Sequence, residues 1–152
     1  MAQVYALLFA AIVCMSNVFI SVTAMAVNFT DCGSESKLVS LDITPCSEQP
    51  CNMKRGTTET GTLTFIPSED ITSAKVKAFA VQEGFNIPLP IPSDACQGYG
   101  LECPVKKGSQ AKFVVKQEIQ QEFPPVKLSI KGEIIDPEGK MVVCFQFPIV
   151  IT

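Results

Sequence analysis

The segment "VKLSIKGEIIDPEGKMVVCFQFPIVI" (residues 126–151) decides the fold. In its first run, 126–135, apolar residues alternate with lysine, serine and glutamate, and in its second run, 141–151, every odd-numbered residue is apolar. A period of two is typical of a strand that buries one face. Between the runs, Asp136-Pro137-Glu138-Gly139 carries the residues that favour a turn. The segment therefore predicts an antiparallel hairpin.

Further runs of the same kind lie upstream, at residues 38–45, 61–67 and 74–81. In the first of them, Val39, Leu41 and Ile43 share one face. Residues 114–123 also predict a strand, although glutamines and glutamates interrupt the pattern. Six to eight short strands with turn residues between them predict an all-β fold, an immunoglobulin-like two-sheet antiparallel β-sandwich.

The first 26 residues contain no charged side chain and end in Ala24-Met25-Ala26, an A-x-A cleavage signal. They predict a secretory signal peptide (1–26) followed by one domain (27–152). A membrane anchor would have about the same length, but the run lacks the positively charged flank that orients such a helix. We therefore expect a secreted protein, with the endosome-lysosome lumen as an alternative destination.

The chain has seven cysteines, of which Cys14 falls in the predicted signal peptide and six remain. An even count in a secreted domain predicts disulfides, and six cysteines allow 15 pairings. Closeness in sequence favours two local bridges and leaves the two ends of the domain for the third. The expected pairs are Cys46–Cys51, Cys96–Cys103 and Cys32–Cys144. Closing a loop of about 100 residues stabilises by about 4.7 kcal/mol in the chain-entropy model, so we expect the long bridge to matter most.

Asn28-Phe29-Thr30 is a glycosylation sequon, so Asn28 is the expected glycan site. The formal net charge is -3, with acids and bases interspersed, and nothing resembles the basic surface of a nucleic-acid-binding protein. We expect a monomer that does not bind nucleic acid.

The chain contains no histidine, which excludes Ser-His-Asp and Cys-His catalysis. Oxidised cysteines supply no thiolate nucleophile. Carboxylate pairs such as Glu69-Asp70 fit solvated turns, and the cysteine spacing does not suit zinc. We therefore expect neither an enzyme nor a bound metal or cofactor.

The stretch "GFNIPLPIP" (residues 84–92) places a proline at every second position of an extended segment. In a strand, Pro88, Pro90 and Pro92 would remove three backbone donors from the same edge. This predicts an edge strand whose outer side no neighbour can join. Ile87, Leu89 and Ile91 would then project together into the interior.

Five segments, taken in order, resemble the ML lipid-recognition family, and specifically its Niemann-Pick type C2 branch. They are "DCGS" (31–34), "ITPCSEQPCNMKRG" (43–56), "IPLPIPSDAC" (87–96) with "LECPVKKG" (101–108), "EFPPVKL" (122–128) and "VCFQFPIVI" (143–151). The resemblance implies an immunoglobulin-like sandwich that binds one lipid between its sheets. It also implies the cysteine pairing expected above.

The resemblance further implies lipid-binding residues. The proline stretch supplies Leu89, with Ile87 and Ile91 beside it, and the segment before the "PP" turn supplies Ile119 and Phe123. Phe145 stands where family members commonly have tryptophan, and Leu89 where they often have phenylalanine. These departures weaken the implied preference for sterols, because an aliphatic mouth also suits a fatty acid.

The implied function is carriage of a sterol or another hydrophobic lipid, with a transient contact to a membrane or an acceptor protein. Two alternatives stay open. One is a secreted carrier of fatty acids or semiochemicals, and the other is an innate-immune protein that recognises lipids such as lipopolysaccharide.

Overall fold

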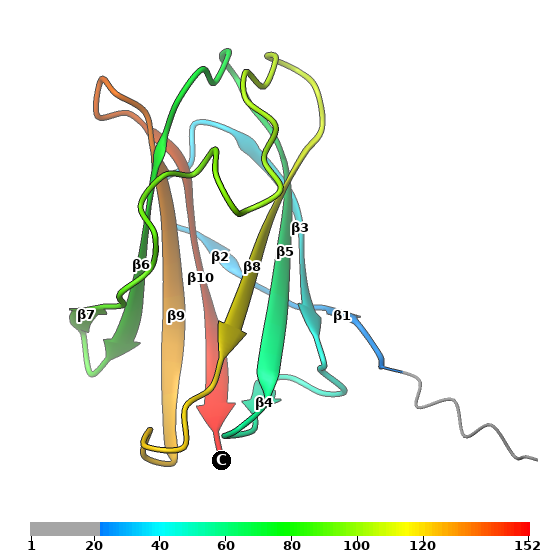
Figure 1. Cartoon of the computed structure of the whole chain (residues 1–152), viewed down its shortest axis with the longest axis vertical. Helices are drawn as coiled ribbons and strands as arrows, with labels where there is room; N and C mark the ends of the chain where they lie inside the picture. The colour runs from blue at the N-terminus through cyan, green and yellow to red at the C-terminus, as the bar shows by residue number, and fades with distance from the viewer. Residues whose placement is uncertain (1–21) are drawn as a thin grey trace, which may run out of the picture.

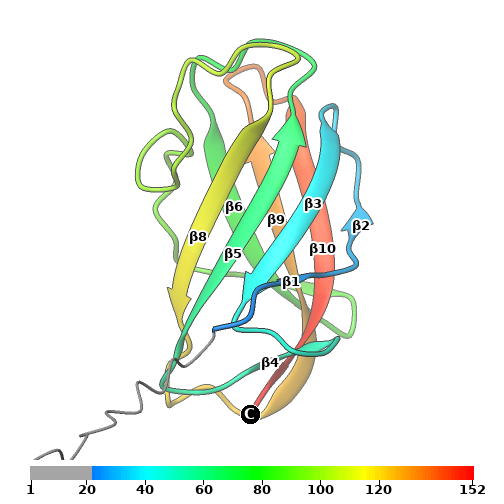
Figure 2. The same ribbon diagram turned by 90° about the vertical axis from the view of Figure 1, so that its right-hand side faces the viewer.

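A computed structural model describes residues 22–152, and all regular structure in this range is β. Two sheets lie face to face and enclose the core (Figures 1 and 2). The predicted immunoglobulin-like sandwich with three disulfides is confirmed.

The smaller sheet has four strands in the order β1-β3-β5-β8. They are β1 (Met25–Ala26), β3 (Lys37–Thr44), β5 (Thr58–Ile66) and β8 (Ala111–Glu118). The larger sheet has the order β2-β10-β9-β6-β7, with β4 paired in parallel to β10. Its strands are β2 (Thr30–Asp31), β4 (Cys51–Met53), β6 (Lys75–Gln82), β7 (Phe85–Pro88), β9 (Val126–Ile135) and β10 (Met141–Ile151). The short strands β1, β2 and β4 raise the number above the six to eight expected.

The predicted hairpin is present, since β10 pairs antiparallel with the whole of β9. In its turn, the Asp136 carboxylate accepts hydrogen bonds from the backbone N–H groups of Glu138 (2.9 Å) and Lys140 (2.8 Å). Gly139 has a φ of 85°, a left-handed conformation that favours glycine. The turn therefore depends on the residues that predicted it.

Two expectations about strands need correction. Val39 does not share the inner face with Leu41 and Ile43, because a bulge between Leu38 and Ser40 shifts the register and leaves Val39 48% exposed. The strand expected at residues 114–123 instead spans Ala111–Glu118 and ends before the glutamine-rich part.

The proline stretch forms the edge predicted for it, with β7 as the last strand of the larger sheet. The Leu89 N–H donates to the Ala78 carbonyl of β6 at 2.9 Å. Because N–H directions alternate along a strand, the nitrogens of Pro88 and Pro90 face the opposite, free edge. That edge has no donor to offer at these positions.

Most of the predicted signal peptide lies outside the described residues. Cleavage after Ala26 would remove β1, which pairs with β3, but the Val27 N–H still donates to the Leu41 carbonyl at 2.8 Å. The domain therefore keeps its attachment to β3 just beyond the predicted cleavage site. Within residues 22–152, no helix has the length and apolar character needed to cross a membrane.

All three expected disulfides are present. Cys32–Cys144 joins the start of the domain to β10 across a sequence separation of 112, whereas Cys46–Cys51 and Cys96–Cys103 close loops with separations of 5 and 7. Cys144 is 1% exposed, so the long bridge ends inside the packed core. It ties the chain before β3 to the last strand.

Removing the long bridge should cost more stability than removing a short one. The chain-entropy model gives about 5 kcal/mol for the Cys32→Ala/Cys144→Ala double variant and about 2 kcal/mol for Cys46→Ala/Cys51→Ala. Urea unfolding of both variants measures the difference. Equal losses of unfolding free energy would show that loop length does not set the contribution of these bridges.

Candidate functional site

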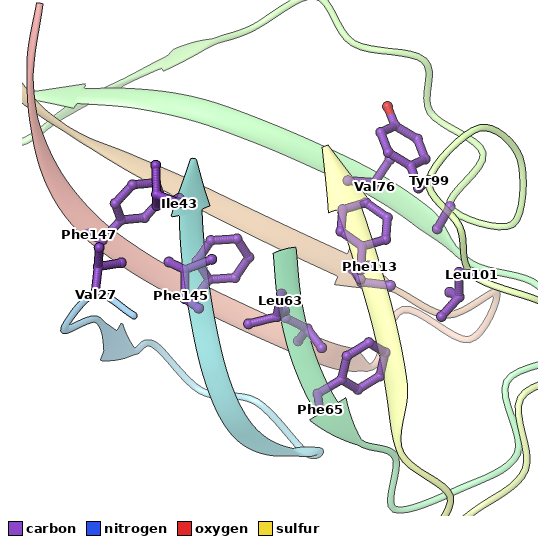
Figure 3. Close-up of a cluster of buried hydrophobic side chains, with 14 of the residues drawn as sticks. Val27, Ile43, Leu63, Phe65, Val76, Tyr99, Leu101, Phe113, Phe145 and Phe147 are labelled. Atoms are coloured by element: carbon purple, nitrogen blue, oxygen red, sulfur yellow. The ribbon is translucent and has the colours of Figure 1, made fainter. Parts of the chain in front are cut away.

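A cavity of about 140 Å³ lies between the two sheets. Side chains from both sheets line it, and Figure 3 shows Ile43, Leu63, Phe113 and Phe145 pointing into the space between the strands. The apolar lining comprises Leu41, Ile43, Leu63, Phe113 and Val115 from the smaller sheet, and Met53, Val76, Ala78, Ile130, Ile134, Phe145, Phe147 and Ile149 from the larger. The inward faces of the predicted strands thus form a cavity as well as a core.

Four of the six predicted lipid-binding residues line this cavity, namely Leu89, Ile91, Ile119 and Phe145. Ile87 does not, and the expectation that it projects into the interior is wrong. Its side chain is 51% exposed on β7, the edge strand of the larger sheet.

Phe123 also lies outside the cavity lining, although it is half-buried and packs against the core. It follows the end of β8, in the loop before β9. Its backbone carbonyl accepts a hydrogen bond from the Arg55 guanidinium at 3.4 Å. Phe123 therefore helps to hold the loop between β8 and β9, whereas Ile119 in the same loop lines the cavity.

Phe145 has room for its ring because the directly paired residue on β9 is Gly132. A Cβ atom at Gly132 would lie 2.6 Å from the Phe145 ring, closer than real contacts allow. A larger residue at position 132 would therefore push the Phe145 ring away from its place against β9.

The mouth of the cavity lies between β8 and the β6–β7 edge. Lining residues there keep some exposure, including Leu89 and Ile91 on one side and Val115 and Gln117 on the other. Lining residues near β10, such as Ile149 (3% exposed), are buried. The side of the sandwich that carries the prolines is thus the open side.

A loop crosses from one sheet to the other beside this mouth. Tyr99 stacks on Phe113 of β8 with ring centroids 4.6 Å apart, and its hydroxyl donates to the Pro92 carbonyl at 2.6 Å. The Val114 N–H donates to the Tyr99 carbonyl at 2.7 Å. Tyr99 therefore holds the end of the proline stretch against β8.

Glu59 is the residue that the sequence analysis missed. It lines the cavity and is only 5% exposed, and its Oε2 atom is buried without a hydrogen-bond partner. The Thr57 hydroxyl lies 3.2 Å from Oε1 but also 2.5 Å from the Lys54 carbonyl, and its single proton serves one acceptor at a time. Burial raises the pKa of Glu59, with the Thr57 hydrogen bond opposing the shift.

A signal for Glu59 was present in the sequence. Glu59, Gly61, Leu63 and Phe65 are spaced by two and share the inner face of β5. The run predicted from residue 61 began two residues too late to include the carboxylate. Within residues 22–152, no group of three or more Asp, Glu, Cys or His side chains could hold a metal ion.

Comparison with known proteins places this cavity in context. The family described as ML domain matches residues 26–151. A zebrafish (Danio rerio) protein named NPC intracellular cholesterol transporter 2 is 34% identical over 127 residues, which cover 82% of this chain and 85% of that protein.

Two solved structures extend the comparison. A Niemann-Pick type C2 protein from Japanese carpenter ant superposes with a TM-score of 0.77 at 28% identity, covering 83% of this chain and all (100%) of the ant chain. Chicken MD-1, solved in complex with lipid IVa, has a TM-score of 0.54 at 15% identity and covers 84% of this chain and 96% of its own, which shows a likeness of fold alone.

Because its pKa is raised, the ionisation of Glu59 lowers the unfolding free energy of the wild-type protein at higher pH, and Glu59→Gln should remove this loss. The folded state binds the proton more tightly than the unfolded state, so the unfolding free energy falls as pH rises from the unfolded pKa through the folded one. Below the unfolded pKa, Glu59 is protonated in both states and the cost is absent. Denaturant unfolding from about pH 4 to about pH 7 should therefore show the variant gaining stability relative to wild type.

Other carboxylates, such as Asp31 with its lowered pKa, are common to both proteins and cancel in this difference. A stability difference that stays constant with pH would contradict the raised pKa of Glu59.

Proposed function

Because this chain belongs to the ML-domain family, we propose that it carries a sterol or a similar hydrophobic lipid between its two sheets. The observation that carries the proposal is the apolar cavity of about 140 Å³, which opens where two strand edges remain unjoined. The relative named as a cholesterol transporter supports a sterol as the ligand.

The proposed mechanism is binding and release without bond chemistry. Burying roughly 400 Å² of ligand apolar surface contributes about 10 kcal/mol at ~25 cal/mol per Å². Immobilising the ligand costs at least about 4 kcal/mol, which leaves at most about 6 kcal/mol, an affinity of tens of micromolar or weaker.

The cavity must widen to take such a ligand. Small-molecule sites typically measure about 300–1,000 Å³, whereas this one measures about 140 Å³. We place the widening at the mouth, where Leu89 and Ile91 follow the end of β7 and belong to no strand. Movement of this segment away from β8 would enlarge the cavity while β7 itself stays paired with β6.

Release to a membrane or an acceptor protein requires the mouth to face it. Phe85 and Ile87 on β7 are 72% and 51% exposed, and they lie on the same edge strand that leads to Leu89. Large apolar side chains at this exposure suit a transient contact with a lipid surface. They supply the contact surface that the proposal needs.

We place the protein outside the cytoplasm, secreted or in the endosome-lysosome lumen. Three disulfides require an oxidising compartment, in agreement with the predicted signal peptide. Asn28 is exposed, so a glycan there would meet no packed surface. We expect the carrier to act as a monomer.

Leu89→Asp should weaken sterol binding at least about tenfold, because it puts a charge at the mouth of an apolar cavity. Titration with a fluorescent sterol measures the affinity, and circular dichroism checks the fold. The matched control is Val39→Asp, which adds the same charge at an exposed apolar position away from the cavity. Unchanged affinity in a folded Leu89→Asp protein would overturn the proposed site.

The Phe85→Ser/Ile87→Ser double variant should bind sterol with wild-type affinity but transfer it between vesicles several-fold more slowly. The reason is that the apolar contact surface is lost while the cavity lining is kept. A stopped-flow transfer assay between donor and acceptor vesicles measures the rate. Wild-type transfer by this variant would show that β7 is not the contact surface.

A further inference from the structure

We infer that Glu59 is the anchor for a hydroxyl group on the bound lipid. The inference rests on the proposed lipid carriage and adds the chemical class of the ligand. It combines a cavity with apolar walls and a carboxyl oxygen inside it that has no partner.

No residue described in the structure donates a hydrogen bond to the Oε2 atom of Glu59. Oε2 is buried and unpartnered, and the Thr57 hydroxyl, which lies beside Oε1, also serves the Lys54 carbonyl. A buried polar atom without a hydrogen bond opposes folding, so such atoms are rare and need a reason. A ligand that brings a hydrogen-bond donor into the cavity would supply the missing partner.

The place of Glu59 also suits an anchor near the entrance. It lies on β5, next to the edge strand β8, where its direct neighbour is the exposed Gln117 at the mouth. From Glu59 the inner face of β5 continues through Gly61 to Leu63, away from any other carboxylate on that strand. A lipid held by its polar end at Glu59 can therefore extend its hydrocarbon along β5.

The Glu59 carboxylate distinguishes lipids by their polar end groups. A carboxylate oxygen accepts a hydrogen bond from a hydroxyl, but it repels the carboxylate of a fatty acid. An ether or a ketone offers no donor to the ionised carboxylate and leaves Oε2 unsatisfied. Glu59 thus favours lipid alcohols, sterols included, over acids, ethers and ketones of the same size.

The test compares ligands that differ only at the polar end. Cholesterol and its 3-methyl ether form one pair, and 1-hexadecanol and methyl hexadecyl ether form a second pair that does not depend on a sterol skeleton. At a pH high enough to ionise Glu59, the wild-type protein should bind each alcohol about tenfold or more tighter than its ether, the range expected for a hydrogen bond to a charged group.

Glu59→Leu should abolish this preference by weakening alcohol binding while leaving ether binding unchanged or improved. Glu118→Gln, which alters an exposed carboxylate on β8, is the matched control and should keep the wild-type preference. Glu59→Gln keeps the size of the side chain and an acceptor oxygen but adds an amide donor that an ether oxygen can accept, so it should reduce the preference for alcohols without abolishing it.

The outcomes separate this inference from the proposed function. Wild-type protein that binds alcohol and ether equally well is a lipid carrier without the anchor, and this result overturns the inference alone. A preference that survives Glu59→Leu also overturns it. Protein that binds none of the four ligands overturns the proposed carriage, and the inference falls with it.

Discussion

The two sheets cannot join along one side of the sandwich, and the cavity depends on this constraint. Pro88 and Pro90 face the free edge of β7 with nitrogens that carry no hydrogen, so β8 has no ladder to continue there. On the other side, the chain crosses from Val27, whose N–H donates to the Leu41 carbonyl of β3, to β2 of the larger sheet (Figure 2). The apolar interior is therefore entered from the side that carries the prolines, where its lining residues keep some exposure.

Packing then determines what the interior can hold. Gly132 allows Phe145 to lie close against β9. Tyr99 stacks on Phe113 of β8 and binds the Pro92 carbonyl, so it holds the end of the proline stretch against β8. Glu59 is the polar exception on the inner face of β5. The same alternation that buries Leu63 and Phe65 buries this carboxylate, so one strand contributes both the apolar wall and the group proposed to recognise the ligand.

Alternation along the strands made most of the fold predictable, because a period of two directly reports which side chains meet the core. It could not predict β1, β2 and β4, since two or three residues show no period. The alternation predicted the wrong face at Val39, because a bulge shifts the register there, and a buried side chain at Ile87, which is exposed on the edge strand β7. Glu59 was missed because a carboxylate on an inner face contradicts the pattern that defines the face.

The central claim is that the space between the sheets holds a lipid. Native mass spectrometry of the secreted protein, followed by extraction and identification of whatever copurifies, tests it most directly. The account predicts one hydrophobic lipid alcohol per chain, a sterol first among them. A protein that is empty as isolated and stays empty when sterol, fatty alcohol and fatty acid are added would contradict it.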